Sequence, residues 1–197
     1  MKGDLFYPLS IIIVAVFLSI YKTFDTKEEE IDFYPTTLDK NIYRKILWYF
    51  SQITYSSNFF LLIYFILKIF KFDTNILFKI IAPICLSVNL NYFLVLYPKK
   101  NIKLYEIPFH SLVLHFMTTF IIINELKYIT YNSFNDVLQY NYFVLYGIII
   151  TILNYNVRGI WSYGVSNLFT KKGWKFFFQF NIISFISSLF LYLYKLN

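Results

Sequence analysis

Short clusters of charge divide the chain into long apolar runs, and this division constrains its fold more than any other feature. Six runs of about 17 or more weakly charged residues can cross a hydrocarbon layer about 30 Å thick as helices. They are Leu5–Tyr21, Ile46–Leu67, Ile80–Tyr97, Pro108–Asn124, Tyr140–Val157 and Phe176–Tyr194. Only helices satisfy their own backbone groups inside lipid over such runs. We therefore predict an all-α, polytopic integral membrane bundle of six transmembrane helices, with residues 1–197 forming one domain.

Composition supports this class of protein. Hydrophobic residues make up 58% of the chain and charged residues 15%, against about 25% charged in soluble domains. The net charge of +7 comes from lysines and arginines at the ends of apolar runs, where they anchor helices at the headgroup layer. We therefore expect membrane lipids as partners and no nucleic acid. The lone Cys85 and two histidines predict neither a disulfide nor a metal site, and no cofactor is expected.

The basic residues also predict an orientation. Of 18 lysines and arginines, twelve fall on the face formed by the loops after the first, third and fifth runs. Six fall on the face that holds both termini: Lys2, Lys68, Lys71, Lys79, Lys127 and Lys195. The positive-inside rule places the richer face in the cytosol. The run Leu5–Tyr21 lacks a small-residue cleavage site, so we expect it to be a retained helix.

One ionisable side chain, His115, lies in the middle of the run Pro108–Asn124. A charge-bearing group at this depth is costly in lipid and is therefore usually turned inward, where its default interpretation is functional. At 1.5 Å per residue, His115 lies about 10 Å beyond Pro108. Glu125, at the end of the same run, is expected to reach for the membrane interface instead.

Hydroxyl groups lie at a matching depth in the second run. Ser51 and Thr54 are about 8 and 12 Å beyond Ile46, which enters from the same face. A hydroxyl within reach of a histidine is the minimal arrangement for nucleophilic acyl transfer. The residues alone leave this interpretation and a structural histidine equally open. Asn89 is a candidate to orient the imidazole, and Trp161 and Tyr163 are candidates for an aromatic rim.

At these positions the chain resembles the androgen-induced membrane protein family, which includes the androgen-dependent regulator of tissue factor pathway inhibitor. The family's fourth span carries a Pro-preceded Asn-His-x-x-His-Thr and a glutamate ten residues after the second histidine. Pro108, His115 and Glu125 match this pattern, while Leu112 and Phe116 replace the first histidine and the threonine. Gly159, Trp161 and Tyr163 match the family's Gly-x-Trp-Val-Tyr-Pro, and Pro83 matches a proline of its third span.

The resemblance implies a six-span threonine hydrolase that cleaves fatty acid esters of hydroxy fatty acids, with His115 as the catalytic histidine. The family's threonine does not carry over directly. In a gap-free match to Arg44-Lys45-Ile46-Leu47, Trp48 takes its place. Ser51 then lies one turn deeper, on nearly the same helix face, whereas a slipped register offers Thr54.

Two functions follow from these observations. The first is an intramembrane serine- or threonine-type lipid-ester hydrolase using His115 with Ser51 or Thr54. The second is a non-catalytic, degenerate relative that binds lipid or a partner, with Trp48 filling the nucleophile position. We expect the endoplasmic reticulum, another endomembrane or the plasma membrane as its location. The resemblance implies cytosolic termini, opposite to the charge rule, and we adopt that orientation.

Overall fold

The structure, a computed structural model, describes residues 3–24, 41–93, 109–159, 161 and 167–196. These residues form helices and connecting turns, without a strand, so the all-α prediction is confirmed for them. The α-helices are α1 (Gly3–Phe24), α2 (Ile42–Ser51), α3 (Ile53–Ile69), α4 (Asn75–Asn91), α5 (Phe109–Ser111), α6 (Thr118–Glu125), α7 (Asn141–Arg158) and α8 (Lys171–Leu196). A π-helical segment, η4 (Leu112–Met117), joins α5 to α6, and the 3-10 helices η5 (Leu126–Tyr128) and η6 (Phe134–Tyr140) follow.

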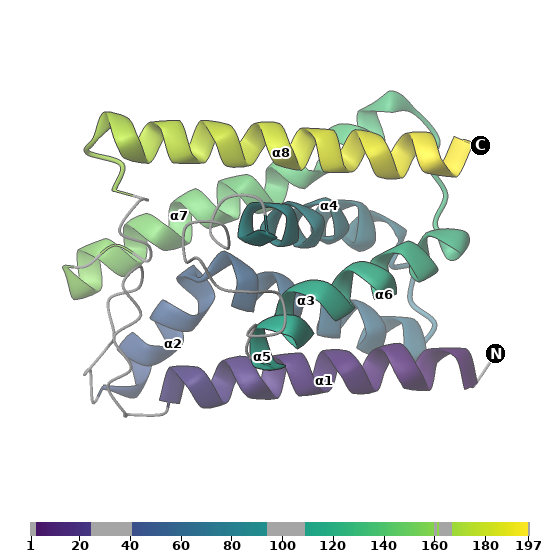
Figure 1. Ribbon diagram of the computed structural model, residues 1–197, viewed down its shortest axis with the longest axis horizontal. Coiled ribbons are helices and arrows are strands. Elements are labelled where there is room, and N and C mark those ends of the chain that lie inside the picture. The colour runs from purple at the N-terminus through teal and green to yellow at the C-terminus, as the bar shows by residue number, and fades with distance from the viewer. Residues whose placement is uncertain (1–2, 25–40, 94–108, 160, 162–166, 197) are drawn as a thin grey trace.

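Most of the helices run along the long axis of the molecule, with α1 and α8 at opposite edges (Figure 1). Helix α4 lies between them and packs against α3, α8 and η6. Every residue of α4 from Ile81 to Asn89 is buried, as expected for a helix that is apolar on all sides. Residues Gly3 and Leu196 lie at the same end of the molecule, which we call the terminal end (Figure 1).

Two of the described helices are long and apolar enough to cross a membrane, Phe134–Arg158 and Lys171–Leu196. The count rises to three if α2 and α3, bent by 87° relative to each other, form one broken span. Phe6–Tyr21 and Asn75–Asn91 are shorter apolar helices. The six-span prediction is therefore not confirmed by helix length. The expected third span also includes residues 94–97, which lie outside the described part of the chain.

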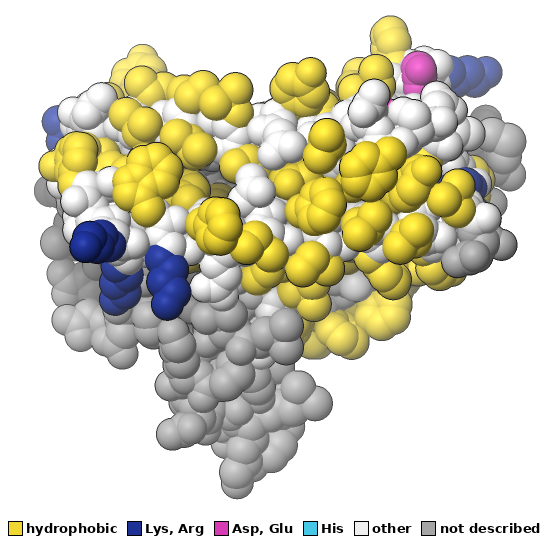
Figure 2. Space-filling model, turned by 90° about the horizontal axis from the view of Figure 1, so that it is seen from above, with side chains coloured by type: hydrophobic (Ala, Val, Ile, Leu, Met, Phe, Trp, Pro, Cys, Tyr) yellow, Lys and Arg dark blue, Asp and Glu magenta, His cyan; other side chains and the backbone are white. Residues whose placement is uncertain are grey.

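The outer surface carries the side chains that lipid would solvate. Phe6, Phe17, Phe70, Tyr142 and Phe178 are all more than 60% exposed. Hydrophobic side chains cover much of the face seen from above, while lysine and arginine side chains lie toward its two ends (Figure 2). An apolar middle between charged ends is the surface pattern of a membrane-embedded bundle.

Two ion pairs hold the terminal end, one buried and one partly buried. Glu125, only 1% exposed, accepts hydrogen bonds from Lys68 Nζ and from the Tyr64 hydroxyl, the latter at 2.8 Å. Lys79 Nζ donates to Asp136 Oδ2 at 2.8 Å, and the backbone N–H of Asn132 donates to the same oxygen. The expectation that Glu125 reaches for the interface was wrong, because Lys68 offers it a partner inside the protein. Lys68 and Lys79 likewise act as ion-pair partners rather than as loop charges.

Candidate functional site

His115 lies in the π-helical segment and is buried, with 8% of its surface exposed. Its imidazole stacks on the ring of Tyr92, with centroids 4.0 Å apart and planes 8° from parallel. Tyr92 directly follows α4, so this stack joins the end of α4 to the middle of η4. The face of the imidazole is thereby fixed against an aromatic ring, which restricts how it turns.

Hydroxyl groups stabilise the widened helical turn that carries His115. Thr118 Oγ1 donates to the Leu114 carbonyl at 3.2 Å, and Thr119 Oγ1 donates to the His115 carbonyl at 3.3 Å. Asn89 Nδ2 on α4 donates to both threonine oxygens, at 3.2 and 2.6 Å. Asn89 therefore holds the backbone of His115 through the two threonines. Asn91, in contrast, donates to the Ser87 carbonyl of its own helix.

A second asparagine joins this turn to α3. Asn58 is 2% exposed, and its Nδ2 donates to the Thr54 carbonyl at 2.9 Å and to the Leu114 carbonyl at 3.4 Å. One amide thus connects the backbone at the candidate nucleophile Thr54 to the residue preceding His115. Thr54 itself is partly buried.

Ser51 is fully buried at the break between α2 and α3. Gln52 is extended (φ −81°, ψ 110°), and this single residue separates the two helices. Ser51 Oγ donates to the Trp48 carbonyl at 2.7 Å, a back-bond of the kind that bends helices. This hydrogen bond must break before the hydroxyl proton can pass to a base.

The polar backbone groups at this break have protein partners. The Phe50 carbonyl accepts from the Tyr146 hydroxyl of α7 at 2.9 Å, and the Gln52 carbonyl accepts from Ser56 N and Oγ. Non-helical backbone at membrane depth is tolerated where protein buries it. The break is therefore a built feature of the fold and not a frayed helix end.

One aromatic side chain brings these segments to a common corner. Tyr55 packs against Val113, Leu114 and Ala15, which belong to η4 and α1. Its ring also lies 6.0 Å from that of Trp48 and 5.5 Å from that of Tyr49 on α2. We call the region formed by the α2–α3 break and η4 against α1 the histidine corner. Ser51, Thr54 and His115 all lie on the segments that meet there.

The proposed rim residues have different positions. Trp48 is 8% exposed within the corner, in edge-to-face contact with Tyr55. Trp161 is 9% exposed and stacks on Tyr155 of α7 at 4.4 Å, with Phe169 at its edge. These contacts assign Trp161 to the α7–α8 connection. Tyr163 lies outside the described residues, so the second rim position is not described.

Sequence reasoning missed Tyr92 and the role of Asn58. Tyr92 stands near the end of a run rich in aromatic residues, where no pattern distinguishes one ring from another. Asn58 carried a signal, since it is a polar side chain within an apolar run. Among the described residues, no three His, Cys, Asp or Glu side chains come together, so this part of the chain offers no metal-binding cluster.

Comparisons of the chain with protein-family models, curated proteins and solved structures gave no match. The function must therefore be argued from the histidine corner itself.

Proposed function

We propose that the protein is a membrane-embedded lipid-ester hydrolase whose reaction centre is the histidine corner. The observation that carries this proposal is the coincidence of two backbone irregularities with the candidate residues. Ser51 lies at the break beside Gln52, and His115 lies in the π-helical segment η4. Both irregularities interrupt regular helical bonding, and such features are frequent at functional sites.

In this mechanism a serine or threonine hydroxyl attacks the carbonyl carbon of the ester, and His115 accepts the hydroxyl proton. Collapse of the tetrahedral intermediate breaks the ester C–O bond, and His115 returns the proton to the departing alkoxide oxygen. Water then attacks the acyl-enzyme, His115 accepts one of its protons, and the hydroxyl is restored as the fatty acid leaves. Ser51 is the first candidate, because it is buried at the break, and Thr54 is the second.

The substrate class proposed is the fatty acid esters of hydroxy fatty acids, as the family resemblance implies. Such molecules are apolar apart from the ester and one carboxylate, so they enter from the bilayer. A bundle with an apolar exterior and a reaction centre within it suits a substrate that never leaves the lipid.

The architecture proposed with this function has six crossings. They are α1, the broken pair α2–α3, α4, the segment α5–η4–α6, η6 with α7, and α8. An even number of crossings agrees with Gly3 and Leu196 lying at one end (Figure 1). We assign that end to the cytosol, as in the family that the chain resembles. A reporter fused after Asn197 that proved lumenal or extracellular would reverse this assignment.

The test is ester hydrolysis by the purified protein in detergent or vesicles. His115→Ala should abolish turnover, and Ser51→Ala should do so if Ser51 is the nucleophile, with Thr54→Ala as the alternative. Ser57→Ala is the matched control, because Ser57 is buried in α3 and its hydroxyl donates to its own helix at 3.1 Å. Wild-type protein that is folded and inactive toward the ester would contradict the proposal.

A non-catalytic lipid-binding relative is the second candidate function, and a specific observation favours it. Trp48, which replaces the family's threonine in the gap-free match, fills part of the histidine corner, and its carbonyl accepts the Ser51 hydroxyl. In that case the wild type binds fatty acid esters without turnover, and His115→Ala leaves the binding unchanged.

A further inference from the structure

A large groove lies at the terminal end, and its inner end reaches Met117, the last residue of η4. It has a volume of about 1410 Å³ and is formed by α1, the end of η4, α6, η5 and the last turn of α8. Small-molecule pockets usually have about 300–1,000 Å³, so the groove is large enough for a lipid chain. Ser51, Thr54 and His115 do not line it.

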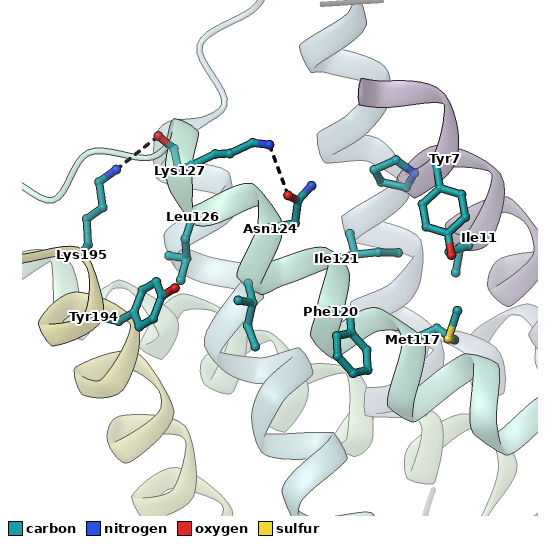
Figure 3. A pocket seen from close by; sticks show the side chains of 12 residues that line it. Tyr7, Ile11, Met117, Phe120, Ile121, Asn124, Leu126, Lys127, Tyr194 and Lys195 are labelled. Atoms are coloured by element: carbon teal, nitrogen blue, oxygen red, sulfur yellow. Dashed lines mark hydrogen bonds between the residues drawn. The ribbon is translucent and has the colours of Figure 1, made fainter. Parts of the chain in front are cut away.

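The groove is apolar at one end and basic at the other. Met117, Phe120 and Ile121 line its inner part, and Asn124, Lys127 and Lys195 lie where α6 and α8 end (Figure 3). Met117 and Asn124 are seven residues apart, which is about 10 Å along a helix. The groove therefore has the polarity of a phospholipid, with an apolar inner part beneath a polar mouth at the end of the bundle.

Two lysine ammonium groups give the mouth of the groove a positive charge. Lys127 Nζ donates to Asn124 Oδ1 at 3.2 Å, and Lys195 Nζ donates to the Lys127 carbonyl at 3.2 Å (Figure 3). Among the described residues neither lysine pairs with a carboxylate, and an ammonium has three donors. The neighbouring Glu125 is buried against Lys68 and Tyr64. Lys127 Nζ also lies 4.9 Å from the centre of the Tyr128 ring. Each ammonium group still has N–H donors and its charge to offer a ligand.

We propose that this groove binds a bilayer phospholipid with a negatively charged head group. One acyl chain lies along α6 from Asn124 toward Met117, and Lys127 and Lys195 bind the phosphate and head-group anions. Basic pockets between membrane helices bind anionic head groups in this way. Because the groove joins the ends of α1, α6 and α8, the lipid also ties these three helices together. The candidate residues Ser51, Thr54 and His115 are not among those that line the groove, so this proposal does not rest on the hydrolase activity.

The test uses the full chain in phosphatidylcholine vesicles that contain a minor fraction of a photoreactive lipid. The probe is phosphatidylserine or phosphatidylcholine with a diazirine near the end of one chain, and mass spectrometry locates the crosslinks. Phosphatidylserine should label the stretches 7–11 and 117–127 more strongly than phosphatidylcholine. Lys127→Gln with Lys195→Gln should lower this preference by about fivefold for each lysine removed. Equal labelling by the two probes in the wild type would overturn the proposal.

The matched control is Lys171→Gln with Lys172→Gln, which removes the same charge from exposed lysines at the other end of α8. Labelling of the groove should not change, and an equal loss in this control would refute the site. If the first double variant fails to fold, Ile123→Trp is used, because Ile123 lines the groove and is 39% exposed. The added indole should reduce phosphatidylserine labelling, and unchanged labelling would count against the proposal. If oleate displaced the probe completely and unlabelled phosphatidylserine did not, the groove would be a site for free fatty acid. That result would overturn the phospholipid proposal.

Discussion

Buried polar groups have different kinds of partner at the terminal end and at the histidine corner. At the terminal end, the pairs Lys68–Glu125 and Lys79–Asp136 join α3 to α6 and α4 to η6 through full charges. At the histidine corner, Asn58, Thr118 and Thr119 donate to backbone carbonyls. Asn89 donates to the two threonine hydroxyl oxygens, so all of these groups are neutral. Charges hold one end in a fixed geometry, whereas neutral groups hold an irregular backbone around an imidazole.

This difference has a chemical consequence. A buried charge close to an imidazole favours one of its protonation states, whereas a general base must exchange its proton during each turnover. The described side chains that hold η4 through these hydrogen bonds, Asn58, Asn89, Thr118 and Thr119, are uncharged. The ion pairs at the terminal end take no part in proton exchange in this mechanism, and they hold neighbouring helices together.

The largest expected effect comes from breaking an ion pair. Asp136→Asn leaves Lys79, 2% exposed, without its carboxylate. Loss of one partner from a buried pair costs about 3–5 kcal/mol, and we expect the free energy of unfolding to fall by that amount. Denaturation in mixed micelles, followed by tryptophan fluorescence, measures it. The double variant Lys79→Met, Asp136→Leu should recover most of the loss, and a double variant as unstable as Asp136→Asn would contradict the role of charge.

The next effect concerns His115, whose replacement should lower the rate of ester hydrolysis much more than the free energy of unfolding. His115→Ala should lower ester hydrolysis by about 10²–10⁴-fold, the usual contribution of a general base. The same change removes the stack on Tyr92, for which about 0.5–1.5 kcal/mol is typical of aromatic pairs. Parallel assays of turnover and unfolding separate the two quantities. A variant that unfolds as readily as Asp136→Asn would show that His115 is structural.

A smaller effect should follow from loosening the π-helical turn. Asn58→Leu removes the amide that joins the Thr54 and Leu114 carbonyls, and interhelical hydrogen bonds in membranes contribute about 0.6–2 kcal/mol. We expect a stability loss in that range together with a clear fall in turnover, because η4 positions His115. Asn91→Leu is the control, since Asn91 donates within α4. Equal turnover in the two variants would remove Asn58 from the site.

The sequence predicted the helices whose apolar runs are uninterrupted. The runs 5–21, 140–157 and 176–194 fall within α1, η6–α7 and α8, since lipid-length apolar stretches have few other ways to satisfy their backbones. The break at Gln52 and the π-helical segment were not predicted. Both arise from hydrogen bonds that shift by a residue or pass to side chains, and such shifts do not alter hydropathy.

The partners of the buried polar groups could not be predicted from the sequence either. Glu125 and Lys68 are 57 residues apart in the chain, and nothing in either local pattern indicates the other. The stack of His115 on Tyr92 and the bridge made by Asn58 likewise depend on tertiary packing. Burial of His115 was accessible from sequence, because the cost of an imidazole in lipid depends only on its position in an apolar run.

The most direct measurement is the mass of the peptide modified by an alkyl fluorophosphonate, which reacts with an activated serine or threonine hydroxyl. Folded wild-type protein in detergent should carry one adduct, on Ser51 or Thr54, and His115→Ala should not be labelled. Ser57→Ala should be labelled as the wild type is. An unlabelled wild-type protein, or an adduct that persists in His115→Ala, would contradict the hydrolase account and leave the non-catalytic relative as the function of the histidine corner.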